Sequence, residues 1–172
     1  MDARVLRVVL VAFAVMAVAA CEPGAATSIA TPVPKPGTSA APREVNLIAK
    51  DYVFLPDALE LIPGETVLLH VINGGLEVHE AILGDARVQL AWEVAEAAVG
   101  GTPPGATPLV SVPPDVAGLR IVVHSGELVD VVWTVPAGVA ASTDWFVGCH
   151  IAGHAEKGMV IPIHWSNGQA AP

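Results

Sequence analysis

Glycine and proline divide the chain between Val45 and Ser166 into short apolar segments, and this division limits what it can fold into. Some segments alternate apolar and polar residues, which is the period of a strand with one buried face. The expected strands are 45–49, 52–54, 65–72, 78–83, 119–124, 128–135, 145–149 and 159–165. Seven or eight short strands separated by turn residues predict an all-β, Greek-key sandwich of two sheets.

Two of the expected strands are joined by a tight turn. Residues 119–124 and 128–135 flank Ser125-Gly126. This spacing predicts a hairpin whose two strands pair with each other.

One segment, residues 86–99, has the period of a helix. Its apolar stripe consists of Val88, Trp92, Ala95 and Val99. Asp85 is the expected N-cap and Gly100-Gly101 the expected stop. With the proline-rich residues that follow, up to 117, it predicts a helical insertion that covers a face or an edge of a sheet. The alternative is a lid over a binding site.

Cys149 is the only cysteine in the region expected to fold, so it has no disulfide partner there. His154 follows five residues later and Met159 five residues after that. Thiolate, thioether and imidazole ligands together favour copper. A buried inert thiol and a structural zinc site are the alternatives, and methionine is not among the usual ligands of zinc.

A metal site of this kind needs a second imidazole, and His79 is the best candidate. It follows the Asn73-Gly74-Gly75 turn at the start of an apolar strand, which places it at one end of the sandwich. The loop between the two C-terminal strands could meet it there. The other histidines outside the loop are expected to be structural or solvent-facing, and they are His70, His124 and His164. His150 directly follows Cys149 and is expected to point away from the sulfur.

These motifs resemble the copper-binding segments of the cupredoxins. The pattern Cys149-x4-His154-x4-Met159 is similar to the family's copper loop, and Asn73-Gly74-Gly75 before His79 is similar to its upstream ligand segment. The resemblance covers residues 45–163 apart from the helical insertion, and the loop spacing is closer to rusticyanin than to plastocyanin. It implies one type 1 copper ion, with His79, Cys149 and His154 as strong ligands and Met159 as the weak axial ligand.

The chain also departs from the family. Glu80 follows the first histidine, where many small cupredoxins have Asn or Asp, so the hydrogen bonding that supports the ligand loop must differ. Of the two residues that flank Cys149, only His150 is a histidine. There is no second set of paired histidines, and the region expected to fold has no cysteine besides Cys149 for another copper centre. We therefore expect an electron carrier and not an enzyme.

The N-terminus predicts export. Arg4 and Arg7 precede a short uncharged apolar run, and small residues precede Cys21, which resembles a bacterial lipobox. We expect residues 1–20 to be a lipoprotein signal peptide and Cys21 to carry the lipid. Residues 21–44 would be a Pro/Ala-rich flexible tether, 45–166 the cupredoxin domain and 167–172 a tail. The alternative is an uncleaved N-terminal anchor.

The chain is acidic, with a formal net charge of −9. This charge argues against nucleic acid as a partner and suits a basic protein.

The function expected is a membrane-tethered, extracytoplasmic electron carrier, in the periplasm or at the cell surface. As a monomer it would cycle Cu(I)/Cu(II) between redox partners such as a c-type cytochrome or a respiratory complex. The alternative is a lipoprotein that buffers or delivers copper. The resemblance places the electron port at His154, in an apolar patch that Ile151, Ala152, Gly153 and Ala155 could supply.

Overall fold

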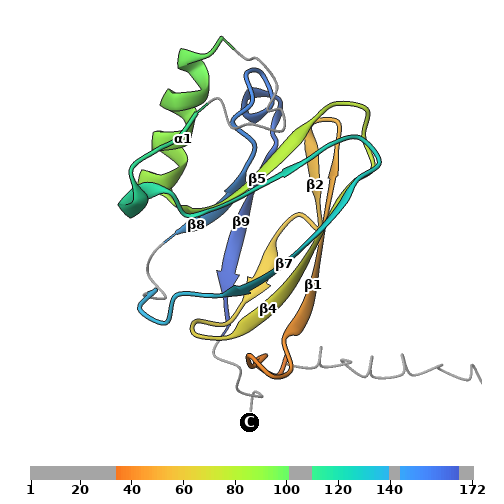
Figure 1. Ribbon diagram of the computed structural model, residues 1–172, viewed down its shortest axis with the longest axis vertical. Coiled ribbons are helices and arrows are strands. Elements are labelled where there is room, and N and C mark those ends of the chain that lie inside the picture. Colours follow the sequence, from red (N-terminus) through yellow and green to blue (C-terminus); the bar gives the residue numbers. More distant parts are fainter. Residues whose placement is uncertain (1–33, 101–109, 140–143, 167–172) are drawn as a thin grey trace, which may run out of the picture. The chain divides into compact units, whose positions relative to one another are not determined.

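The computed structural model describes residues 34–100, 110–139 and 144–166, which form two sheets around one core (Figure 1). The four-stranded sheet contains, in order, β2 (Val53–Leu55), β1 (Arg43–Lys50), β4 (Thr66–Asn73) and β7 (Leu128–Thr134). The five-stranded sheet contains β3 (Leu59–Leu61), β9 (Val160–Trp165), β8 (Trp145–Gly148), β5 (His79–Asp85) and β6 (Leu119–Val123). The predicted all-β sandwich is confirmed.

The core forms where the inward faces of the two sheets meet. In β1 the predicted alternation is observed, with Val45, Leu47 and Ala49 all buried. Leu69 from β4 and Val147 from β8 belong to the same cluster. Each fully buried aliphatic side chain of this kind contributes about 1.5–3 kcal/mol through the hydrophobic effect. The core therefore provides a rigid frame for the loops at the ends of the strands.

The predicted hairpin around Ser125-Gly126 is wrong. β6 pairs antiparallel with β5, and β7 pairs antiparallel with β4, so the turn crosses from one sheet to the other. Asn73, at the end of β4, holds this crossing: its side-chain amide donates to the Val123 carbonyl at 3.0 Å, and its backbone N–H donates to the Glu127 carbonyl at 2.9 Å. A Ser-Gly pair indicates that the chain reverses its direction, but it does not determine with which strands the two flanking segments pair.

The helical insertion is confirmed as α1 (Ala86–Ala98). The Asp85 carboxylate caps it and accepts hydrogen bonds from the backbone N–H groups of Arg87 and Val88, both at 3.0 Å. Val88 and Trp92 pack on Ile82, on the outer face of the five-stranded sheet. The helix therefore covers a sheet face, as expected, but the buried stripe continues through a charged residue.

That residue is Glu96, which is buried, whereas Ala95 and Val99 of the expected stripe are only half-buried. Its carboxylate binds Arg120 of β6. Two short 3₁₀ turns complete the described helices, η1 (Pro114–Val116) and η2 (Ala155–Lys157).

The strand β3 was not expected from the sequence. It has three residues and pairs in parallel with β9, so its place depends on a partner about a hundred residues away. At the other end of the chain, the backbone of Gly37 already exchanges hydrogen bonds with Glu65 and Thr66. Contact with the sandwich thus begins inside the segment expected to be a tether.

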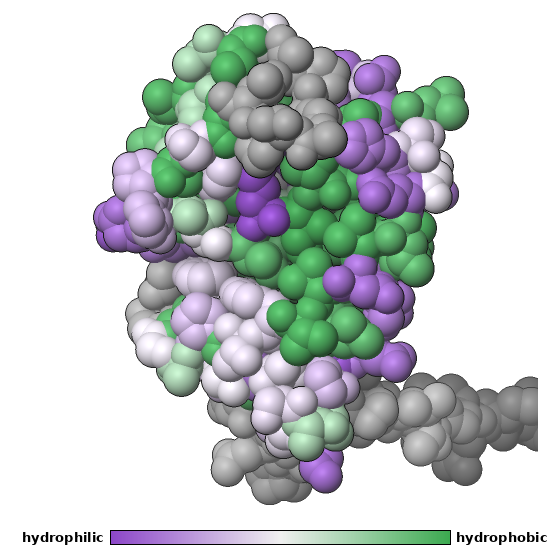
Figure 2. Space-filling view, viewed as in Figure 1, coloured by the Kyte–Doolittle hydropathy of each residue, from purple (hydrophilic) through white to green (hydrophobic). Residues whose placement is uncertain are grey.

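The expected signal peptide, the expected lipidation site Cys21 and the expected tail 167–172 lie outside the described residues. Within the described ranges, none of the helices has the length and apolar character needed to cross a bilayer. Apolar surface is nevertheless present, and Figure 2 shows it gathered over the middle of one face. The exposed large apolar residues include Leu128 and Val132 on β7.

Candidate metal centre

Three side chains that the sequence singled out meet at one end of the sandwich. The Nδ1 atoms of His79 and His154 are 3.2 Å apart, and the Cys149 sulfur is 3.3 Å from His154 Nδ1. One ligand atom from each residue lies within 4.8 Å of the others. His79 and Cys149 are 0% exposed and His154 is 6% exposed. This is a buried group with the separation that donor atoms on a single metal ion require.

Strand pairing explains why residues far apart in the chain meet here. β5 and β8 run antiparallel, so the first residue of β5, His79, and the residue after β8, Cys149, lie at the same end of the sheet. The loop that follows then returns to β9. Its turns use Gly153 and Gly158, whose φ angles of +84° and +100° are in the left-handed region that favours glycine.

Met159 closes this loop from inside the core. Its carbonyl accepts the Cys149 N–H at 3.1 Å, and its own N–H donates to the His154 carbonyl at 3.2 Å. The side chain is fully buried among apolar residues. The structure thus places Met159 next to two of the three grouped residues, Cys149 and His154.

The protonation chemistry of the group suits a metal ion. Burial raises the pKa of the Cys149 thiol to about 12, although the backbone N–H groups of Glu80 and Ile151 hydrogen-bond to the sulfur and act in the opposite direction. Burial, followed by the neighbouring His79, lowers the pKa of His154. The imidazole is therefore neutral and offers a lone pair. A soft metal ion that takes the place of the thiol proton would satisfy all three donors.

Asp51, at the turn after β1, fixes the other side of His79. Its Oδ1 atom is 3.2 Å from His79 Nε2. The carboxylate also accepts hydrogen bonds from the backbone N–H groups of Glu77 and Leu76. Both bonds lower the pKa of Asp51, and the bond from Glu77 has the larger effect. An ionised carboxylate only accepts hydrogen bonds, so Nε2 carries the ring proton and Nδ1 presents its lone pair to the group. Sequence reasoning missed Asp51, since only the contact across the fold gives it a role.

Tyr52 covers His154. Its backbone φ is +71°, which is uncommon for a residue with a side chain. The Tyr52 ring meets the His154 ring edge-on, with centroids 5.1 Å apart, and the Lys157 ammonium lies 3.5 Å from the centre of the Tyr52 ring. The apolar patch expected here needs correction, because Ile151 is buried in the core, whereas Ala152 is exposed.

Glu80, the main departure from the cupredoxin pattern, is fully buried and links the two ligand segments. One carboxylate oxygen accepts the backbone N–H of His150 at 3.1 Å, and the other accepts from Arg120 Nε at 2.8 Å. Arg120 also donates to Glu96 of α1 at 2.9 Å. Burial raises the pKa of both Glu80 and Glu96, and Arg120 partly offsets this effect. The carboxylate thus supports the ligand loop through the backbone.

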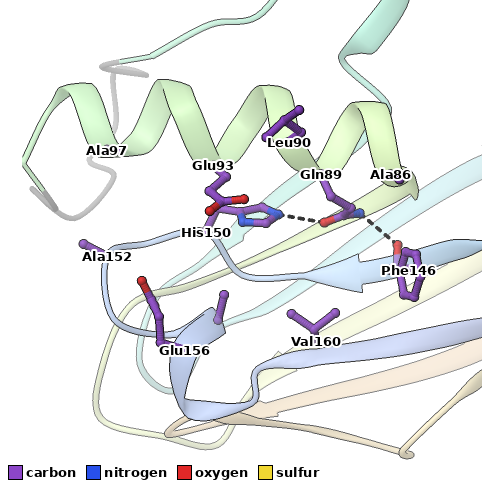
Figure 3. A pocket seen from close by; sticks show the side chains of 11 residues that line it. Ala86, Gln89, Leu90, Glu93, Ala97, Phe146, His150, Ala152, Glu156 and Val160 are labelled. Atoms are coloured by element: carbon purple, nitrogen blue, oxygen red, sulfur yellow. Dashed lines mark hydrogen bonds between the residues drawn. The ribbon is translucent and has the colours of Figure 1, made fainter.

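His150 points away from the metal group, as expected. Its Nε2 atom lies 2.7 Å from the Gln89 side-chain oxygen, and the Gln89 amide donates to the Phe146 carbonyl at 3.1 Å (Figure 3). His150 and Gln89 line a groove of about 580 Å³ between α1 and the ligand loop.

The remaining histidines pair with carboxylates elsewhere, in the pairs His70–Asp130, His124–Glu127 and His164–Glu60.

Comparison with known proteins supports the fold. No family model and no curated protein matches the chain. Among solved structures, reduced auracyanin from Roseiflexus castenholzii is 15% identical with a TM-score of 0.56, covering 76% of this chain and 99% of that one. Auracyanin B is 23% identical with a TM-score of 0.57, covering 77% and 98%. Auracyanin A of Chloroflexus aurantiacus, described as a "blue" copper protein, is 19% identical with a TM-score of 0.55, covering 73% and 100%. The resemblance that the motifs indicated is thus confirmed in three dimensions, and the chain has the cupredoxin fold.

Proposed function

We propose that this domain is a blue-copper electron carrier that binds one copper ion through His79, Cys149 and His154, with Met159 as the weak axial ligand. The observation that carries the proposal is the convergence of the first three donors within 4.8 Å in a buried pocket of the fold. Two imidazoles and a thiolate with a long thioether contact are the ligand set of blue-copper electron-transfer sites.

Copper would supply one-electron chemistry, and the protein supplies a frame that changes little between oxidation states. His79 and Cys149 adjoin paired strands, and the hydrogen bonds of Met159 clasp the loop that bears His154. Cysteine and methionine favour the reduced ion, whereas imidazole suits both states. A rigid site with mixed ligands supports rapid electron exchange because little has to move.

We further propose that electrons pass through His154, which lies closest to solvent among the three donors. The net charge of −9 favours a basic redox partner, such as a c-type cytochrome. Attachment to a membrane through a lipid on Cys21, and an extracytoplasmic location, are the parts of the proposal that rest on the N-terminal sequence alone.

Redox titration of the copper-loaded protein tests the carrier role. We expect an intense visible absorption that bleaches and returns reversibly, and rapid electron exchange with a basic c-type cytochrome used as a probe. A colourless form that readily loses Cu(I) would contradict the carrier role and support copper buffering or delivery instead. Cys149→Ser is the matched control, since it should abolish the colour while the apolar core keeps the fold.

A further inference from the structure

We propose that Asp51 is a positioning residue that holds His79 in one tautomer and lowers the reduction potential of the bound metal. This inference rests on the proposed function for its second half only. Asp51 belongs to a turn that carries no metal ligand, and its contact with His79 spans 28 positions of the chain.

The structure holds the Asp51 carboxylate in place from several sides. In addition to His79 Nε2 at 3.2 Å, it accepts the Leu76 N–H at 2.9 Å and the Glu77 N–H at 3.1 Å. Gly75 allows this approach, because a Cβ atom there would lie 2.3 Å from the Asp51 Oδ1 atom and 2.8 Å from its backbone nitrogen. The turn before His79 and the turn after β1 are therefore built to fit each other.

This contact determines which nitrogen of His79 is free. With Nε2 donating to the carboxylate, Nδ1 keeps its lone pair and lies 3.2 Å from His154 Nδ1, inside the group of donors. A carboxylate that accepts the second ring N–H of a ligating histidine fixes the ring orientation and makes the imidazole a stronger donor. Asp51 thus prepares His79 before any metal is bound.

The charge of Asp51 has a second consequence. The carboxylate is separated from the donor atom of His79 by one imidazole ring, and its side chain is 34% exposed, so the charge is only partly screened. A negative charge at this distance favours the more positive oxidation state, Cu(II), over Cu(I). The Asp51 charge therefore lowers the reduction potential. The apolar surroundings of Met159 act in the opposite direction, because they favour the less charged Cu(I) state. Glu80 makes no such contact with a ligand ring, and Arg120 balances its charge.

The first test needs no metal. Nitrogen-15 NMR of the His79 ring in the metal-free protein should show the proton on Nε2 in the wild type and a mixture of tautomers in Asp51→Ala. A wild-type ring with its proton on Nδ1 would overturn the positioning role. A protein that takes up no copper would contradict the proposed function, but this spectrum would still decide the role of Asp51.

The second test measures the potential. Asp51→Asn keeps the shape and removes the charge, so we expect the potential to rise and the affinity for Cu(II) to fall by about 10-fold or more, the usual scale for partners of ligating residues. Asp51→Glu should restore part of the effect. Asp130→Asn is the matched control, because Asp130 binds the non-ligand His70 at 2.7 Å on the surface. Equal potentials for Asp51→Asn and Asp130→Asn would overturn the proposal.

Discussion

Asp51 and Glu80 both lie beside His79, but they differ in burial and in charge balance. Glu80 is completely buried and bound to Arg120, which also binds the buried Glu96. The Asp51 side chain is 34% exposed, and its ring partner is the His79 imidazole, where Glu80 has a guanidinium. Burial raises the pKa of Glu80, whereas backbone hydrogen bonds from Glu77 and Leu76 lower that of Asp51.

The difference indicates a division of roles around the metal group. The Glu80 carboxylate accepts the backbone N–H of His150 and is bound to Arg120, so it connects structural elements. Asp51 contacts the imidazole of His79, a proposed copper ligand, so we infer that it acts on the reduction potential of the site. We expect changes near Glu80 to affect mainly the free energy of unfolding, and changes at Asp51 to affect mainly the reduction potential.

The largest effect is expected for Arg120→Met. Removing the guanidinium leaves the Glu80 and Glu96 carboxylates buried without a cation, which costs about 3–5 kcal/mol of unfolding free energy. Urea denaturation measures the loss. Arg87→Met is the control, since Arg87 and Asp115 form an exposed pair with side chains 71% and 73% exposed. Similar losses in the two variants would contradict the structural role of the network.

A smaller loss is expected for Gly75→Ala. The new methyl group would overlap the Asp51 carboxylate and backbone, and relief of the overlap should cost about 1–3 kcal/mol. Because Asp51 is then displaced from His79, the potential should also rise, as in Asp51→Asn. Gly138→Ala is the control, since a Cβ atom there meets nothing within 4 Å. An unchanged reduction potential in Gly75→Ala would contradict the expectation that the close packing of Gly75 on Asp51 is needed for the effect of Asp51 on the metal.

The smallest effect is a difference in the pH dependence of unfolding. A raised pKa in the folded state means that the contribution of Glu96 is full below its ordinary pKa of 4.5 and is lost as the pH rises through the folded value. For Asp51, the contribution is present above 3.8 and is lost as the pH falls through its lowered value.

Denaturant unfolding of the metal-free protein over a pH series measures both contributions. We expect Glu96→Gln to lose less stability than the wild type as the pH rises above 4.5, and Asp51→Asn to lose less as the pH falls below 3.8. For each variant, the difference in unfolding free energy from the wild type is plotted against pH. If these two differences changed with pH in the same direction, the contrast between Glu96 and Asp51 would be contradicted.

The features that sequence could predict are those fixed by local pattern. The glycines of the ligand loop and the turn before His79 have a local conformational reason, and the cap and register of α1 follow from Asp85, Val88 and Trp92. The metal group was predictable because soft donors at these spacings have few other uses. Its geometry, however, depends on the pairing of β5 with β8.

The remaining features depend on contacts between distant parts of the chain. Glu80 and Glu96 are buried only because Arg120 reaches them from β6, 40 and 24 positions away. Asp51 acquires its role from His79. The turn at Ser125-Gly126 could join strands within a sheet or between sheets, and Asn73 decides between the two. None of these contacts could be predicted from the residues adjacent in the sequence.

The most direct test of the metal centre is titration of the metal-free protein with Cu(II), followed by visible absorption. The ligand assignment predicts an intense copper–thiolate band that grows linearly and stops at one copper per chain. The same titration of Cys149→Ser should give no such band, and Met159→Leu should shift the band without abolishing it. A wild-type protein that develops no intense band, or one whose band survives in Cys149→Ser, would contradict the assignment of His79, Cys149 and His154 as copper ligands.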